Sequence, residues 1–473
     1  MAAPGLSAGG AAGTRLVPLV LAVALFMEQL DSTVIATALP AIAADIGTSP
    51  VSLKLAFTTY LVALAIFIPV SGWLADRLGA KRVFRLAIVV FALGSIACAF
   101  AGSLGAFVLA RFLQGMGGSM MTPIARLLLV RGTPRNRLVP AMAWLTVPAL
   151  IGPMAGPPLG GFLTTYLSWH WIFWLNVPIA AVGLILVGRY LPDSPPRPPR
   201  PIDLPGFVLA ALALAGLVFG LSVTSLPALP IEVGFATLAI GALSAAGYAA
   251  HARRAAYPLL DPAMLRYPLF RAAILGGSLF RVGIGAIPFL LPLMLQLGFG
   301  MTAFESGLVT FIAAVGALGA KFLAAPLLQA VGFRRVLAVG VLLSAALTAS
   351  YGLFTPTTPA AAMMALLFLG GVLRSVTFTG VNALAFSDVE DADAGQATAI
   401  NAVAQQVSLA TGVAVGGAVL ELAARLHGGG VAVADFHAAF VAVAAVSSLG
   451  ALVFLTLPRD AGAAVSGHRQ AAE

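Results

Sequence analysis

The chain has 473 residues, of which 60% are hydrophobic and only 9% are charged, and its formal net charge is +9. Soluble proteins carry about 25% charged residues, so this composition excludes an ordinary soluble enzyme, a disordered chain and a disulfide-stapled secreted domain. We therefore expect an integral membrane protein.

Apolar runs that are long enough to cross a bilayer recur along the whole chain. A helix needs about 20 apolar residues to span the hydrocarbon core, and the runs are continuous and not alternating, which excludes a β-barrel. The sequence predicts an all-α membrane protein with fourteen transmembrane helices, at residues 16–38, 54–74, 83–102, 106–126, 139–163, 171–190, 204–223, 231–250, 272–297, 303–327, 334–353, 359–381, 396–421 and 434–457.

The first run and the basic residues predict the orientation. A signal peptide has a short apolar core with a cleavage site close behind it, and residues after 14 show no such pattern. We therefore expect the first apolar run to be a retained anchor. With a cytoplasmic N-terminus, most of the 26 lysines and arginines fall on cytoplasmic connections and only Lys54 and Arg425 fall outside. This asymmetry predicts cytoplasmic termini and an even number of spans. Four bases remain within spans: Arg111, Arg281, Lys321 and Arg374.

The first predicted helix carries the two acids that we place inside the membrane, Glu28 and Asp31. Their spacing of three puts them on neighbouring parts of one helix face. A carboxylate in hydrocarbon is costly and usually functional, so we expect at least one to carry protons. A structural hydrogen-bonded pair is the alternative, and Glu28 is also a candidate contact for a cationic substrate. Arg111 of the fourth helix needs a buried partner, and the pairing is either a proton-controlled switch or a fixed link.

The loop after the second helix combines glycines and charges: Gly72, Asp76, Arg77, Gly79, Lys81 and Arg82. We expect Gly72 to permit a close helix contact and Gly79 a tight turn. Asp76 is expected to accept hydrogen bonds from a helix N-terminus, and Arg77 and Arg82 to pair with acids on the cytoplasmic side. The sequence thus predicts a gating loop whose contacts hold the inside gate shut when the cavity faces outward, although bases here also serve the orientation rule.

The fifth helix contains glycines four residues apart, which predict a smooth stripe for close helix packing, and prolines that predict a kink. The residues are Gly152, Pro153, Gly156, Pro157, Gly160 and Gly161.

In the second half, Asn401, Gln405, Ser408 and Gly412 form a polar stripe on one predicted helix. Such a stripe either bonds to neighbouring helices or lines a wet cavity. We expect the substrate cavity to include Gln114, Arg281, Arg374, Asn401 and Gln405.

A weak internal repeat divides the chain. Residues 72–83 are echoed by residues 327–336 at an offset of 253, which places Gly332 opposite Gly79. We expect a six-helix bundle at 1–190, a linker with two inserted helices at 191–271, and a second six-helix bundle with a cytoplasmic tail at 272–473. Transporters are commonly built from such repeats, with the site at their interface.

Five segments make the chain resemble the major facilitator superfamily, and within it the fourteen-span drug:proton antiporter family. Residues 72–82 are similar to the superfamily's signature loop and residues 30–40 to the first-span motif of the antiporter family. Residues 111–115, 152–161 and 169–178 resemble its fourth-span, fifth-span and sixth-span motifs. The resemblance implies the major facilitator fold, favours Asp31 and Arg111 in proton transfer, and associates the fifth-span motif with antiport.

Three residues depart from the family's patterns. Ala36 replaces the usual asparagine of the first motif, Ala80 the usual base of the signature loop, and His170 the usual arginine. The first two departures weaken any transfer of fine mechanism but not the resemblance itself.

Together these features predict a proton-coupled secondary transporter, which exports amphipathic compounds by alternating access. A proton-coupled importer or a dedicated metabolite exporter is the alternative. A membrane enzyme is disfavoured because no nucleophile–base group or metal-ligand spacing is visible, and nucleic-acid binding because the bases form no continuous face. The sequence lacks a P-loop, so we expect the transmembrane proton gradient to drive transport, with no cofactor. The family resemblance and the lack of an organelle-targeting segment imply the bacterial inner membrane, and we expect a monomer.

Overall fold

The computed structural model describes residues 13–133, 137–193, 195–196, 201–224, 226, 230–426 and 428–463, and within these ranges all regular secondary structure is helical. The predicted N-terminal segment and much of the proline-rich linker lie outside the described residues.

The helices follow the predicted spans. Eleven described helices are long and apolar enough to cross a membrane, twelve with one bent pair, and two further helices, α5 and α6, have 29 residues each. The elements are α1 (Gly13–Val34), α2 (Leu39–Asp45), α3 (Lys54–Leu78), α4 (Ala80–Ala99), α5 (Leu104–Gly132), α6 (Leu138–Tyr166), α7 (His170–Trp174), α8 (Asn176–Tyr190), α9 (Leu204–Val223), α10 (Ile231–Ala252), α11 (Pro268–Leu293), α12 (Ala303–Gly319), α13 (Lys321–Val331), α14 (Phe333–Tyr351), α15 (Ala360–Leu384), α16 (Ala394–Leu426) and α17 (Val433–Leu455).

The tenth span differs from the single helix predicted at 303–327. It consists of α12 and α13, whose axes differ by 50°. The break falls at Gly319 and Ala320, and glycine is a poor helix former because its backbone loses more entropy than that of other residues.

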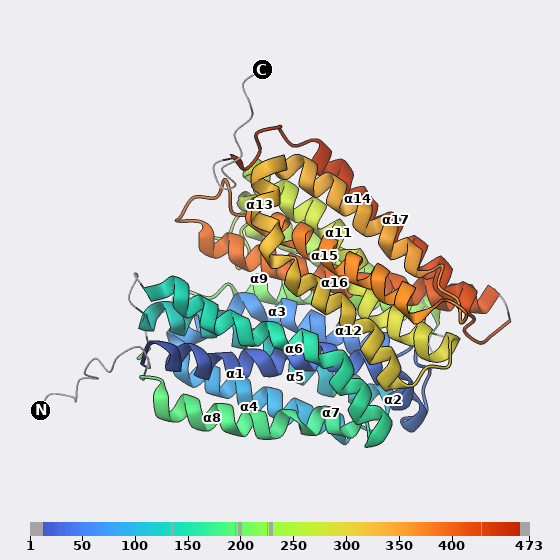
Figure 1. Ribbon diagram of the computed structural model, residues 1–473. Helices are drawn as coiled ribbons and strands as arrows, with labels where there is room; N and C mark the ends of the chain where they lie inside the picture. The colour runs from blue at the N-terminus through green and yellow to red at the C-terminus, as the bar shows by residue number, and fades with distance from the viewer. Residues whose placement is uncertain are drawn as a thin grey trace, which may run out of the picture.

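The helices form two groups (Figure 1). One apolar core is built from α1, α3, α4, α5, α6 and α8, with residues such as Phe84, Phe91 and Met121. A second core is built mainly from α11 and α13 to α17, with Phe270, Phe280 and Phe454. Separate cores support the proposed division into bundles at 1–190 and 272–473.

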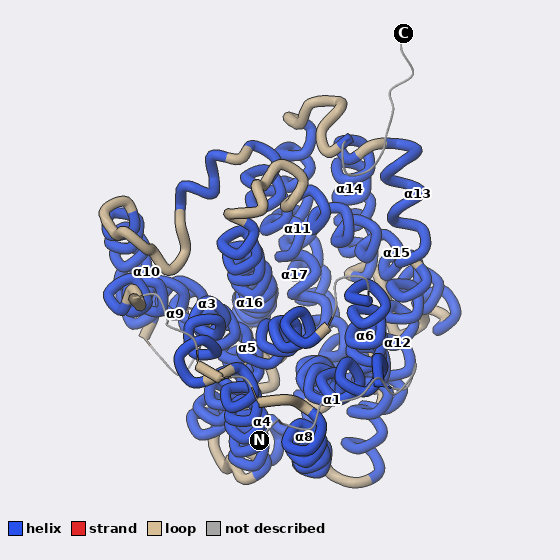
Figure 2. Tube along the Cα trace, turned by 90° about the vertical axis from the view of Figure 1, so that its left-hand side faces the viewer, coloured by secondary structure: helices blue, strands red, loops and turns tan. Residues whose placement is uncertain are grey.

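The inserted helices α9 and α10 form an antiparallel pair at one side of the molecule (Figure 2). Their backbones approach closely where Gly216 faces Gly241. Within this pair α9 contacts α3 of the first bundle and α16 of the second, so the insert rests against both bundles through one helix.

The two ends of the molecule differ in packing. At the end away from the start of α1, here called the far face, a third apolar cluster combines both bundles, with Leu39 and Phe57 from the first and Phe289, Leu420 and Phe436 from the second. At the opposite end, the terminal face, a cavity lies between the bundles. The structure is therefore closed at the far face and hollow toward the terminal face.

The glycine stripe of α6 packs against α1. A Cβ atom at Gly152 would lie 2.9 Å from the Leu30 nitrogen, and one at Gly156 would overlap Thr33. Gly161 instead faces the backbone of Ala303 on α12. The motif therefore joins two helices of one bundle and also touches the other bundle.

Gly156→Leu is expected to separate α6 from α1 and to lower the free energy of unfolding by about 1–3 kcal/mol, because overpacked side chains force backbone shifts. Thermal unfolding of the purified protein measures this loss. Gly188→Leu is the matched control, since a Cβ at Gly188 meets open space. Equal stability of the two variants would show that the stripe is no packing seam.

Candidate functional site

A central cavity of about 620 Å³ lies between the bundles. Its walls come from α1, α3 and α5 on one side and from α15 and α16 on the other, and its polar lining includes Glu28, Gln29, Ser119, Thr122, Arg126, Asn382, Thr398, Asn401, Gln405 and Gln406. A deep pocket of about 240 Å³ shares Glu28, Gln405 and Gln406 with it and adds Tyr60 and Arg111. The site thus joins residues that lie more than 350 positions apart in sequence.

Glu28 faces this space. Its side chain lines both the central cavity and the deep pocket, and the Thr122 hydroxyl donates a hydrogen bond of 2.9 Å to Glu28 Oε2. Only 7% of Glu28 is exposed. A carboxylate in this position can meet a bound molecule directly.

Asp31 lies behind the cavity wall in a polar network. Arg111 Nη1 donates to Asp31 Oδ2 at 2.7 Å, while Gln114 Nε2 and Asn176 Nδ2 donate to Oδ1 at 2.7 and 2.8 Å. Ser95 Oγ accepts from both amides and donates to the Phe173 carbonyl. The network around the Asp31 carboxylate therefore joins five helical segments of the first bundle, α1, α4, α5, α7 and α8.

Arg111 separates Asp31 from the deep pocket. The arginine lines that pocket and Asp31 does not, and its guanidinium lies over the Tyr60 ring at 4.2 Å. Arg111 and Asp31 are each 1% exposed. The guanidinium therefore shields Asp31 from the deep pocket.

Only two of the five residues expected in the substrate cavity line it. Asn401 and Gln405 line the central cavity. Gln114 does not; it is fully buried in the Asp31 network because its amide satisfies both Asp31 and Arg111. Arg374 also lies away from both lining sets, where its Nη1 donates to the Tyr351 hydroxyl at 3.3 Å. Arg281 is buried directly behind the lining.

The predicted gating loop makes the sharp turn at Gly79, whose φ is 92°, and its expected gate contacts, which belong to the state closed at this face, stay predictions. Among the described residues, Asp76 accepts a hydrogen bond of 2.8 Å from Arg131 of α5. Arg77 lies over the Trp73 ring at 5.1 Å. Within the described ranges no carboxylate is at ion-pair distance from Arg77 or Arg82, because cavity opening separates the facing elements here.

Lys81 and Gly72 of the same loop have different surroundings. Lys81 donates to the Leu191 carbonyl at 2.6 Å and to Asp193 at 3.0 Å, which ties α4 to the end of α8. A Cβ atom at Gly72 meets nothing within 4 Å, and Gly72 lines the central cavity. In this conformation Gly72 therefore borders the cavity and makes no close helix contact.

The sequence analysis missed a buried pair that joins the bundles. Lys54 begins α3, is fully buried, and lies 2.8 Å from Glu421 of α16 at the far face. Gly417 leaves room for the Lys54 stem, since a Cβ there would approach its Cδ at 2.6 Å. The expectation that only Glu28 and Asp31 are acids within spans is thus wrong, because α16 extends to Leu426.

Asn176, Ser95, Tyr60 and Thr122 were also missed as site residues. Asn176 lies in the sixth-span motif, which was noted only as part of the resemblance, and it starts α8. Single hydroxyl and amide side chains give no periodic signal, so sequence alone could not join them to Asp31.

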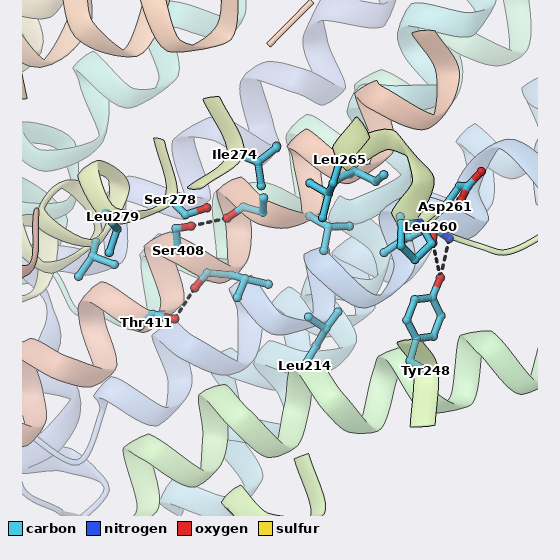
Figure 3. A pocket seen from close by; sticks show the side chains of 16 residues that line it. Leu214, Tyr248, Leu260, Asp261, Leu265, Ile274, Ser278, Leu279, Ser408 and Thr411 are labelled. Carbon is cyan, nitrogen blue, oxygen red and sulfur yellow. Dashed lines mark hydrogen bonds between the residues drawn. The ribbon is translucent and has the colours of Figure 1, made fainter. Parts of the chain in front are cut away.

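A second face of α16 borders a different pocket of about 510 Å³ (Figure 3). Its mostly apolar lining includes Leu214 of α9, Ile274 of α11 and Thr411 of α16. Tyr248 of α10 closes one end through hydrogen bonds of 2.7 Å with the backbone of Leu260. Helix α16 therefore separates this apolar pocket from the polar central cavity.

Comparison with known proteins agrees with this architecture. A model of the Major Facilitator Superfamily matches residues 21–275 and 273–472. Proteins named multidrug resistance protein MdtD are 34% identical, over 93% of this chain and 95% of the protein in Pectobacterium carotovorum subsp. carotovorum (strain PC1), and over 93% and 94% in Salmonella paratyphi A (strain ATCC 9150 / SARB42).

Solved structures show the same fold at low identity. A D-xylose-proton symporter aligns with a TM-score of 0.68 and 17% identity, covering 94% of this chain and 98% of that one. The POT family transporter PepTSo aligns with a TM-score of 0.68 and 14% identity, covering 93% and 97%.

Asp31→Asn is expected to lower the free energy of unfolding by about 3–5 kcal/mol, because it leaves the Arg111 charge buried without its counter-charge. The double variant Asp31→Asn/Arg111→Gln removes both charges and is expected to recover most of this loss. Thermal unfolding of the purified variants measures both effects.

Arg266→Gln serves as the control, since the Arg266–Asp393 pair is exposed and such pairs contribute about 1 kcal/mol or less. A double variant as unstable as the single one would show that the buried charges do not compensate each other.

Proposed function

Because this chain belongs to the major facilitator superfamily, it is a membrane transporter and not an enzyme, and we propose that it exports small amphipathic molecules in exchange for protons. The observation that carries the proposal is the buried Asp31–Arg111 pair. Arg111 lines the same deep pocket as the acid Glu28, and Asp31 lies directly behind Arg111. Acids and bases stranded in a membrane bundle are typical of proton relays.

The coupling step uses competition for one carboxylate. Arg111 and the two amides bond to Asp31 in its charged form; protonation removes the charge that holds the guanidinium. Arg111 is then free to turn toward the deep pocket, which it already lines. One charge crossing 100 mV supplies about 2.3 kcal/mol, which is comparable to the free energies that separate conformations of one protein.

Alternating access follows from the two unequal faces. The distribution of bases makes the terminal face cytoplasmic, so the structure corresponds to a state open to the cytoplasm, with both termini on that side of the inner membrane. Release to the outside requires the far face to open and the Lys54–Glu421 pair to part, while Gly72 and its loop come together with the second bundle.

Export of amphipathic molecules is supported by three features. The cavity lining combines many polar side chains with apolar ones such as Leu64 and Phe378, which suits compounds that have both characters. Helix α6 carries the motif associated with antiporters, and the relatives with 34% identity are named for multidrug resistance. The same fold in a sugar–proton symporter shows the fold alone, so transport direction is the part that experiment must decide.

Purified protein in liposomes with an internal pH indicator is expected to release protons into the lumen as a fluorescent cationic dye is taken out. The Asp31→Asn/Arg111→Gln variant is expected to let dye equilibrate but to lose uphill transport at least about 100-fold, because no titratable group remains in the network. Glu232→Gln, at an exposed acid of α10, is the control. Undiminished uphill transport by the double variant would remove the network from coupling, and inward accumulation by cells would indicate an importer.

Lys54→Gln/Glu421→Gln is expected to shift the population toward the state open at the far face at least about fivefold, because the pair stabilises only the closed state. Spin labels on Ser49 and Gly430, which border the pair from the two bundles, report the far-face distance distribution. Asp45→Asn is the control, since the Asp45–His170 pair lies within one bundle. An unchanged distribution in the double variant would show that the pair is no latch.

A further inference from the structure

Arg281 is a buried cation that the proposed coupling step does not use. It lies near the middle of α11 and is fully buried. Across the described ranges no carboxylate lies at ion-pair distance from it, and its Nε and Nη1 atoms have no hydrogen-bond partner. An uncompensated charge is strongly unfavourable in the membrane interior, so a counter-charge from outside the chain would satisfy it.

The guanidinium stands directly behind the central cavity. Its Nη2 donates to Asn382 Oδ1 at 3.0 Å and lies 3.4 Å from Asn401 Oδ1, and its Cζ is 5.4 Å from the centre of the Phe378 ring. Asn382, Asn401 and Phe378 all line the cavity. A molecule in the cavity is therefore separated from the charge by one layer of side chains.

The hydrogen bonds of Asn382 and Asn401 polarise the Asn382 amide toward the cavity. Asn382 Oδ1 accepts from Arg281 and also from Asn401 Nδ2 at 3.1 Å. With its oxygen occupied twice, Asn382 keeps its Nδ2 hydrogens for a molecule in the cavity. Donors that are polarised by a cation bind anionic oxygens more strongly than neutral ones.

The internal repeat places this cation opposite an acid. Gly79 and Gly332 end equivalent helices with φ of 92° and 82°, and their separation of 253 residues is also the separation of Glu28 and Arg281. Helices α1 and α11 therefore carry opposite charges at equivalent positions of the two bundles. On the side of the first bundle the cavity lining carries both Glu28 and Arg126, whereas on the side of the second bundle the cation Arg281 stands behind the lining.

We propose that Asn382, Asn401 and Arg281 form a subsite for a carboxylate of the transported molecule, so that the chain accepts amphipathic organic acids and zwitterions. This inference rests on the proposed function and specifies the substrate class of the same cavity. The carboxylate accepts from the Asn382 amide and supplies the charge that Arg281 lacks. In a zwitterion the cationic group faces Glu28.

The test compares two fluorescent dyes in the same proteoliposomes, a carboxylate-bearing fluorescein derivative and cationic ethidium. The wild type is expected to transport both. Arg281→Gln is expected to lower the ratio of fluorescein-type to ethidium transport at least tenfold. Arg374→Gln is the matched control, because Arg374 is the other arginine near the middle of a helix in the second bundle and lies outside the cavity lining; its ratio is expected to stay within twofold of the wild type.

Asn382→Asp places a carboxylate next to Arg281 and keeps the arginine. This variant therefore remains informative even if the protein does not fold without the Arg281 charge. It is expected to raise the thermal stability and also to lower the dye ratio at least tenfold, because the new carboxylate occupies the subsite. A structural role for Arg281 predicts the higher stability with an unchanged ratio, and this result would overturn the proposal.

The remaining outcomes are equally distinct. An equal loss of both dyes in Arg281→Gln, or ethidium transport by a wild type that neither binds nor moves the carboxylate dye, contradicts the subsite and leaves the proposed export intact. Failure of the wild type to move either dye or any proton contradicts the proposed function itself.

Discussion

The structure depends on how a few charges are compensated where water is scarce. Arg111 and Asp31 are almost completely buried, and each is tolerable in a membrane only because the other lies 2.7 Å away. Gln114, Asn176 and Ser95 complete the bonding of the carboxylate. Since these groups come from different helices, the same bonds that satisfy the charges also hold the first bundle together.

The second constraint comes from the proposed alternating access, which requires the bundles to be joined at one face at a time. At the far face the joint is an apolar cluster with the Lys54–Glu421 pair beside it, and at the terminal face the cavity keeps the bundles apart. In the proposed cycle, these apolar contacts and the buried pair are exchanged for contacts of similar free energy at the other face. This balance is what alternating access requires of a transporter.

The two walls of the cavity carry different chemistry although they derive from related halves. Glu28 of α1 faces the cavity, whereas Arg281 of α11 lies behind Asn382 of α15. The proposed coupling acts on the first wall and the proposed carboxylate subsite on the second. In this proposed arrangement the proton binds within the first bundle, while the transported molecule contacts both bundles, so that each can influence how the two are placed.

The sequence by itself determined the class of protein and its helices, because about 20 consecutive apolar residues have few alternatives to a membrane span. It also indicated the pairing of Arg111 with an acid of α1, since a buried charge demands a partner. Only the tertiary structure decided that Asp31 is that partner, that Gln114 belongs to its network and not to the cavity, and that Lys54 meets Glu421. Such contacts join residues up to 367 positions apart, and they are set by how helices rotate and approach, which the spacing along one helix does not encode.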